Sequence, residues 1–155
     1  MLISSKGVDT LEKFNFRLNK VLEYRESIEN INKSEYGKAK KKLDDETEIL
    51  EEIISYKDSI NLERDKLASK TTIRNFKNYD LYLKSIKEKL IEQSNIVEAA
   101  QTNAEVARNK LINSSVDKKI LENLRKRDFD NYLYQVKKQE EKIIDQIVSY
   151  KSSVK

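Results

Sequence analysis

The sequence contains no cysteine, histidine, proline or tryptophan, and its only glycines are Gly7 and Gly37. Without cysteine there is no disulfide, thiolate nucleophile or zinc-thiolate site, and without histidine the commonest general base and metal ligand are missing. The two glycines stand too far apart for a phosphate-binding loop, which needs clustered glycines. We therefore expect no enzymatic activity, no catalytic residue, no metal site and no cofactor.

Long hydrophobic runs are also absent. Residues 1–7 hold Leu2 and Ile3 as their only branched aliphatic residues, which is too few for the hydrophobic region of a signal peptide. No later stretch approaches the roughly 20 apolar residues that a membrane-spanning helix needs. The sequence thus predicts a soluble protein of the cytoplasm.

Charged residues, in contrast, are abundant and make up 37% of the chain. A composition rich in Lys, Glu, Leu and Ile with few helix breakers is typical of long helices and coiled coils. The hydrophobic residues, also 37%, are spread as stripes and cannot fill a wide core. We expect an all-α, rod-shaped molecule without strands.

The clearest stripe begins at Phe76, where apolar residues recur seven apart in one lane and again in a second lane three residues later. The first lane is apolar at all six positions and the second at four of five, which predicts a coiled-coil seam against another helix of the same chain. The first lane is Phe76, Leu83, Leu90, Val97, Ala104 and Leu111, and the second is Tyr79, Ile86, Gln93, Ala100 and Ala107.

A partner stripe occupies the N-terminal half of the chain. It starts near Leu11, where Asp9 or Thr10 is placed to cap a helix. Two registers follow one another, and a four-residue shift around residues 28–39 would connect them. Gly37 lies inside that shift and costs roughly 1 kcal/mol of helix stability relative to Ala. The first register is Phe14, Leu18, Val21 or Leu22, Ile28 and Ile31; the second is Tyr36, Leu43 and Leu50, with Ala39, Ile53, Ile60 and Leu67.

Between the two stripes, Ser69, Lys70, Thr71 and Thr72 favour a turn over helix interior. The whole chain, 1–155, is thus predicted to form a long two-helix antiparallel coiled-coil hairpin, with helices at about 10–67 and 75–153 and a turn at about 68–74. We expect a monomer, and a parallel homodimer is the alternative. We also expect the second helix to continue through residues 113–117, with a shifted lane beyond: Phe129, Val136, Ile143 and Tyr150, with Leu133, Ile147 and Val154 beside it.

Three segments, in order, resemble the FliJ family, the stalk protein of the bacterial flagellar type III export apparatus. They are FNFRLNKVLEYRE from Phe14, YLKSIKEKLIEQ from Tyr82 and KKILENLRKR from Lys118. Chain length and hairpin architecture agree, whereas residues 1–10 are longer than the family pattern. The resemblance implies a non-catalytic coupling rod at the inner face of the cell membrane. Its terminal end would enter the pore of the hexameric export ATPase, its body would reach the cytoplasmic part of the export gate, and it would escort export chaperones.

An ATPase contact is expected at the terminal end, because residues 118–155 hold ten basic and six acidic side chains and so carry the whole net charge of +4. Basic side chains there would steer the rod toward acidic pore loops. The alternative is a solvated charged face. The predicted pairing of the two helices brings the start of the first helix close to the end of the second. The residues that approach one another are Phe14, Phe16 and Leu18 on one side and Phe129, Leu133, Val136 and Ile143 on the other. The candidate ATPase-binding residues are Phe16, Arg17, Lys20, Arg125 and Arg127.

A contact with the export gate is expected where an apolar residue directly precedes a seam position, because that residue widens the apolar stripe beyond what the helix pair itself needs. Tyr56 and Tyr82 widen the stripes of the two helices at matching spacing, which predicts an exposed, partly apolar patch. The resemblance implies the same positions. The alternative is that these residues thicken a narrow core. The candidate gate-binding residues are Ile49, Ile53, Tyr56, Ile60, Tyr82, Ile86, Lys89 and Gln93.

Other function classes fit less well. Aromatic residues beside basic ones, as in Phe76-Lys77, are found in nucleic-acid binding proteins, but 27 acidic residues are mixed throughout this chain. A membrane-bending rod needs a one-sided basic face, and acidic residues interrupt each candidate face. We therefore expect no nucleic acid, and association with the membrane only through proteins. The remaining alternative is a structural coiled-coil scaffold or chaperone without a motor partner.

Overall fold

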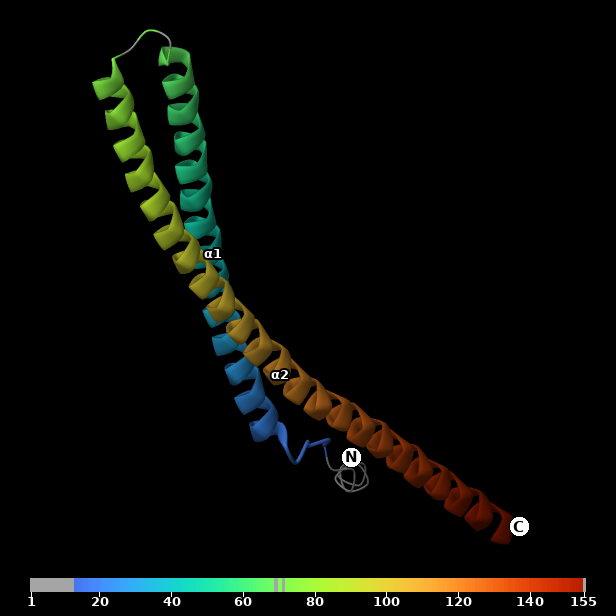
Figure 1. Ribbon diagram of the computed structural model, residues 1–155. Helices are drawn as coiled ribbons and strands as arrows, with labels where there is room; N and C mark the ends of the chain where they lie inside the picture. Colours follow the sequence, from blue (N-terminus) through green and yellow to red (C-terminus); the bar gives the residue numbers. More distant parts are fainter. Residues whose placement is uncertain (1–12, 69, 71, 155) are drawn as a thin grey trace, which may run out of the picture. The chain divides into compact units, whose positions relative to one another are not determined.

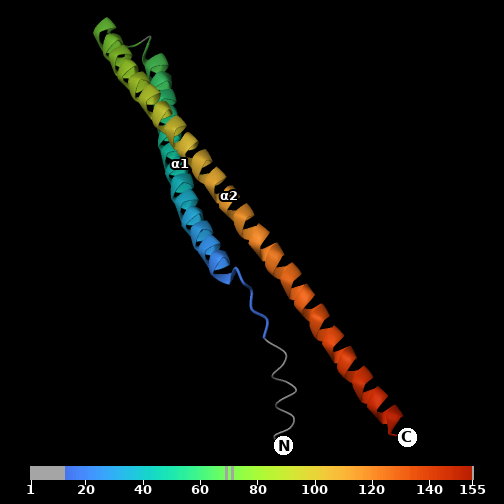
Figure 2. The same cartoon turned by 90° about the horizontal axis from the view of Figure 1, so that it is seen from below.

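The structure, a computed structural model, describes residues 13–68, 70 and 72–154 (Figure 1). In these residues there are two helices, α1 (Asn19–Leu67, 49 residues) and α2 (Ile73–Ser153, 81 residues). They pack against each other as an antiparallel hairpin, and this confirms the predicted fold class (Figures 1 and 2). Neither helix has a stretch long and apolar enough to cross a membrane within the described ranges.

The hairpin divides into two units that we describe separately. The turn unit comprises residues 30–113, in which α1 and the first half of α2 lie side by side. The terminal unit comprises residues 13–29 and 114–154, in which the start of α1 and the segment before it pack on the second half of α2.

The predicted seam of α2 is confirmed by burial. Leu83, Ile86, Gln93, Ala100 and Ala104 are between 4% and 8% exposed, and the other predicted positions are half-buried. The seven-residue repeat therefore turns one face of α2 toward α1 throughout the turn unit.

In α1, the prediction that the apolar repeat shifts by four residues around residues 28–39 is wrong. The least exposed residues follow one uninterrupted seven-residue repeat, in which Arg25, Glu29 and Asn32 occupy the positions where the apolar pattern fails. Ile31, expected in the seam, is 54% exposed. The inward lanes are Leu22, Glu29, Tyr36, Leu43, Leu50, Lys57 and Arg64, and Arg25, Asn32, Ala39, Glu46, Ile53 and Ile60.

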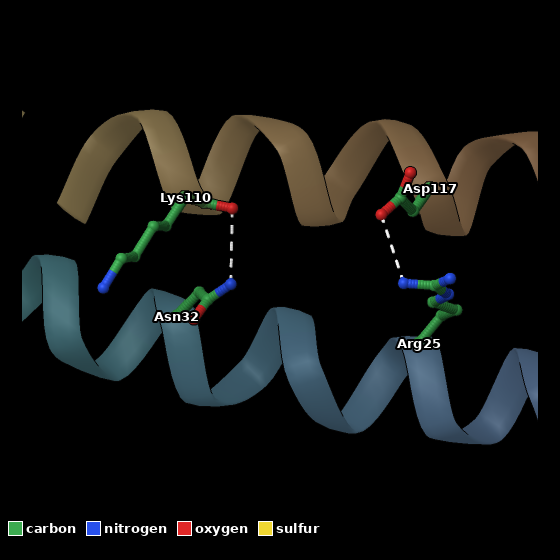
Figure 3. Close-up of polar contacts among 4 residues, drawn as sticks. All are labelled: Arg25, Asn32, Lys110 and Asp117. Atoms are coloured by element: carbon green, nitrogen blue, oxygen red, sulfur yellow. Dashed lines mark hydrogen bonds and ion pairs between the residues drawn. The ribbon is translucent and has the colours of Figure 1, made fainter. Parts of the chain in front are cut away.

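Two of these polar residues, Arg25 and Asn32, face α2 and have polar partners there (Figure 3). In the terminal unit, Arg25 Nη1 lies 3.2 Å from Asp117 Oδ2. In the turn unit, the Asn32 side-chain amide donates to the backbone oxygen of Lys110 at 3.3 Å. Both contacts remain exposed to solvent, so these side chains face α2 without the desolvation penalty of full burial.

The start of α1 also differs from expectation. The proposed caps Asp9 and Thr10 lie outside the described residues, and residues 13–18 are not helical. The chain instead turns at Phe16, whose carbonyl accepts from the amide of Asn19 at 3.1 Å. Phe16 is only 5% exposed, so burial of this ring favours the turn over another helical turn.

The connection between the two helices lies at the segment from which the turn was predicted. The amide of Lys70 donates to the Leu67 carbonyl at 3.0 Å at the end of α1. Thr72 caps α2, since its hydroxyl accepts from the amide of Asn75 at 3.4 Å, three residues into the helix. Gly37 lies within α1 with open space around its Cα and without a positive φ.

Helix α2 runs without a break through residues 113–117, and Ser114 is buried there. The shifted seam expected beyond it ends early. Val136 is half-buried, but each described residue from 137 onward is exposed. Ile143, Ile147, Tyr150 and Val154 were thus wrongly assigned to the seam, since they are between 49% and 71% exposed.

Candidate functional site

A tyrosine pair joins the two helices of the turn unit. Tyr56 of α1 and Tyr82 of α2 are hydrogen-bonded through their hydroxyl oxygens at 2.7 Å. Their ring centroids lie 6.3 Å apart with an interplanar angle of 84°, an edge-to-face arrangement that aromatic pairs favour. The side chains remain 49% and 45% exposed. Both rings are therefore fixed in position and accessible to a partner.

The hydrogen bond also affects the chemistry of the pair. It raises the pKa of the Tyr56 phenol above its ordinary value of 10.0, because the bond stabilises the neutral form, and partial burial acts in the same direction. Tyr56 thus presents a neutral hydroxyl group at physiological pH.

A shallow groove lies beside this pair and is lined by residues of both helices. Five of the eight candidate gate residues meet there, and the other three do not line it. Ile49 is 42% exposed elsewhere on α1, whereas Ile60 is half-buried. The groove is lined by Glu52, Ile53, Tyr56, Tyr82, Ser85, Ile86 and Lys89.

Gln93, the third candidate outside the groove, belongs to the helix interface. Its side-chain amide donates to the Glu46 backbone oxygen at 3.0 Å and to Glu46 Oε2 at 2.6 Å. It is only 8% exposed. Its polarity, which interrupts the apolar lane in the sequence, therefore serves a contact between α1 and α2.

In the terminal unit, an aromatic cluster holds the segment before α1 against α2. The Phe14 ring lies 5.1 Å from Phe129 and 5.6 Å from Tyr132, measured between centroids. Tyr132 thus takes the contact that the sequence pattern assigned to Leu133 and Ile143, which are 48% and 49% exposed.

The candidate ATPase residues fall into two groups. Phe16 is buried and stabilises the unit from inside. Arg17, Lys20, Arg125 and Arg127 are exposed. A groove next to the aromatic cluster is lined by Phe14, Glu122, Arg125, Lys126 and Phe129. Arg125 is thus the basic candidate that adjoins an apolar surface.

Sequence reasoning missed a surface at the end of α2. Residues 137–154 present aliphatic and basic side chains together, all of them exposed. The periodicity that marks this surface is the one that suggested a buried seam, and the exposure of these side chains distinguishes the two. The exposed members are Lys137, Lys138, Lys142, Ile143, Ile144, Ile147, Val148, Tyr150, Lys151 and Val154.

A comparison with known protein families decides the assignment. Residues 14–155 match the family model described as the flagellar FliJ protein. The chain belongs to the FliJ family. The match begins at Phe14, the first residue of the segment that resembles the family in sequence. FliJ proteins are non-catalytic components of the flagellar export apparatus. No curated protein and no solved structure matches the chain.

Proposed function

We propose that this FliJ protein is a cytoplasmic coupling stalk that links the hexameric export ATPase to the cytoplasmic part of the membrane export gate. In this proposal, the terminal unit binds the ATPase, the tyrosine groove of the turn unit binds the gate, and the free protein is a monomer that also escorts export chaperones. The observation that supports it most directly is the tyrosine groove, because both helices build it and its rings are exposed.

Exposed aromatic side chains held by a hydrogen bond are favourable contact residues. Tyrosine buries a large area at a small cost in side-chain entropy, and it is enriched at protein interfaces. Lys89 and Glu52 line the groove with one positive and one negative charge. We therefore expect the gate to offer an apolar surface with an acidic or hydrogen-bonding group.

The terminal unit supports an ATPase contact through charge. Arg17, Lys20, Arg125 and Arg127 are exposed, and none forms an ion pair with another described residue. Charges of this kind raise the association rate with an acidic partner more than the affinity. The exposed end of α2 adds aliphatic side chains that a ring pore would cover.

The gate contact is tested by replacing Tyr56 and Tyr82 together with Ala. Because both rings are about half exposed, we expect the free energy of unfolding to fall by only about 1 kcal/mol. Binding to the cytoplasmic part of the gate should fall by roughly tenfold or more, as for the loss of two interface aromatics. Isothermal calorimetry measures the binding, and urea denaturation measures the stability.

A matched control replaces Tyr24 and Tyr134 with Ala, since these are 59% and 61% exposed in the terminal unit. It should leave gate binding unchanged. A Tyr56→Ala, Tyr82→Ala variant that binds the gate like the parent chain would place the gate site elsewhere. If the parent chain neither stimulates ATP hydrolysis by the export ATPase nor binds the gate, it is instead a structural scaffold.

A further inference from the structure

The turn between the helices carries a strongly one-sided charge. Residues 66–79 include four basic side chains and no aspartate or glutamate, and this is the longest stretch of the chain without an acidic residue. The four lie at the end of α1, in the turn and at the start of α2, all within the turn unit. We call Lys66, Lys70, Ile73, Arg74 and Lys77 the basic tip.

Intramolecular contacts do not account for these charges. The four basic side chains are exposed, and none forms an ion pair with another described residue. Arg74 lies in the first turn of α2, which contains no acidic residue. A positive charge at a helix N-terminus opposes the helix dipole. A local arrangement that disfavours the helix is typical of a functional surface.

An exposed aliphatic side chain lies among the charges. Ile73, the first residue of α2, is 79% exposed, more than the other large hydrophobic side chains in the described part of the chain. It borders a shallow apolar groove with Phe76 and Lys77. The tip therefore combines a hydrophobic side chain that is available for insertion with a positive charge on each side of it.

We propose that the basic tip binds the surface of an anionic phospholipid bilayer directly, in contrast to the expectation from the sequence that the chain meets the membrane only through proteins. Basic residues are attracted to anionic headgroups, and an aliphatic side chain between them enters the boundary of the acyl chains. A stable protein interface covers about 800 Å² on each partner, whereas a few basic side chains and one inserted aliphatic side chain are enough for a reversible bilayer contact. The helix faces elsewhere mix acidic and basic residues, which restricts the contact to the tip. The inference does not depend on the proposed ATPase and gate contacts.

Sedimentation of the full chain with vesicles tests the proposal. Vesicles of phosphatidylcholine with about one third phosphatidylglycerol should bind the chain at low salt, because each basic residue near such a surface contributes roughly fivefold to binding. Binding should weaken as salt is raised to about 0.5 M, where the screening length is only a few ångströms. Vesicles of phosphatidylcholine alone should bind little. Equal binding to both compositions would overturn the proposal.

The decisive variant replaces Lys66, Lys70, Arg74 and Lys77 with Gln and should lose binding by a factor of several hundred, roughly fivefold for each residue. A matched control replaces four other exposed lysines, Lys38, Lys40, Lys41 and Lys42, with Gln. Both variants lower the formal net charge from +4 to 0, but acidic residues follow the control lysines closely in the sequence. We expect the control to keep its binding. Helix content by circular dichroism shows that each variant is folded.

A further variant separates charge from insertion. Ile73→Ser should weaken vesicle binding by roughly tenfold, since one aliphatic side chain no longer leaves water, and its salt dependence should persist. Two results would overturn the proposal. One is an equal loss of vesicle binding in the tip variant and in the control variant, which would indicate a response to net charge alone. The other is no sedimentation of the parent chain with anionic vesicles, which would leave an acidic protein surface as the partner of the tip.

Discussion

Glu29 and Lys118 form an enclosed ion pair between the two helices of the terminal unit. Lys118 Nζ lies 3.0 Å from Glu29 Oε1, and the two side chains are 24% and 6% exposed. Pairs of this kind contribute less to stability than to specificity, because desolvation offsets most of the attraction. Since a shifted register would leave Glu29 buried without Lys118, the pair disfavours alternative alignments of α1 on α2.

The first prediction concerns the pH dependence of this pair. The hydrogen bond with Glu29 raises the pKa of Lys118 above its ordinary value of 10.5, and Glu29, Glu122 and Glu26 add to the effect through their charges, while burial opposes it. Folding therefore favours the protonated amine. The resulting stability is present below the unfolded-state pKa and is lost as the pH rises through the folded-state pKa.

Replacing Lys118 with Met should lower stability at neutral pH and flatten its decline under alkaline conditions. Urea denaturation between about pH 8 and about pH 11 measures both effects, since the unperturbed lysine titrates in that range. Lys119→Met, at an exposed neighbouring position, is the control and should decline like the parent chain. Curves of equal slope for the parent chain and Lys118→Met would show that the pair does not couple to folding.

At the residue scale, the sequence predicted the seam positions of α2 within the turn unit well and the polar seam positions of α1 poorly. Leu83 and Ile86 were found because a seven-residue repeat of apolar side chains rarely occurs outside a helix that packs lengthwise on another. Arg25, Glu29 and Asn32 were missed, since charge and amide groups normally indicate solvent. Their inward position depends on partners far away in the sequence, which a periodicity search does not detect.

The same reasoning applies to the candidate gate site. Tyr56 and Tyr82 could be selected because each lies one position before a seam residue, and the structure brings them together. Gln93 was selected with them, but it bonds to Glu46 across the interface. Sequence spacing places a residue on a helix face to within one position. It does not show whether the opposite helix already occupies that residue.

At the element scale, helix boundaries depend on tertiary contacts. The end of α1 and the start of α2 follow from local chemistry, as in the capping of α2 by Thr72. The start of α1 at Asn19 does not, because it reflects burial of Phe16 and the contact of Phe14 with Phe129. Likewise, the end of the α2 seam after Val136 is shown by the exposure of the residues that follow and not by any change in the apolar pattern.

The second prediction distinguishes the observed repeat of α1 from the shifted one. Leu22 is 3% exposed and Ile31 is 54% exposed. Leu22→Ala should therefore lower the free energy of unfolding by about 2–4 kcal/mol, whereas Ile31→Ala should change it by less than about 1 kcal/mol. Urea denaturation of both variants measures the difference. A larger loss for Ile31→Ala would instead support the shifted register, with Ile31 in the seam.

A third prediction uses the open position of Gly37. No described atom would crowd a Cβ there, and the residue lies inside α1. Gly37→Ala should thus raise the free energy of unfolding by about 0.5–1 kcal/mol, since alanine loses less backbone entropy on folding into a helix. Thermal denaturation followed by circular dichroism measures the gain. A loss of stability would mean that the glycine is needed for close approach of another segment.

At the scale of the whole molecule, charge separates the proposed contacts. The net charge of +4 comes from residues 118–155, and the rest of the chain is balanced. Within the balanced part, the basic tip stands out because no acidic residue interrupts it. Fold class could be read from the sequence because it depends on a repeat along the chain, and family membership because it depends on three segments in a fixed order. The individual partners depend on a few exposed side chains, and these patterns do not identify them.

The last prediction tests the proposed ATPase contact. Arg125→Glu with Arg127→Glu reverses two exposed charges of the terminal unit. We expect it to reduce the stimulation of ATP hydrolysis by the export ATPase by roughly tenfold, and the remaining stimulation to depend less on salt, because the lost attraction is screened by ions.

Lys40→Glu with Lys41→Glu is the matched control, since either double variant lowers the formal net charge from +4 to 0. The control should stimulate hydrolysis like the parent chain, and both variants should keep gate binding. Unchanged stimulation by the Arg125→Glu, Arg127→Glu variant across a range of salt concentrations would show that these charges are solvated, and would direct the search for the ATPase contact to the aliphatic side chains at the end of α2.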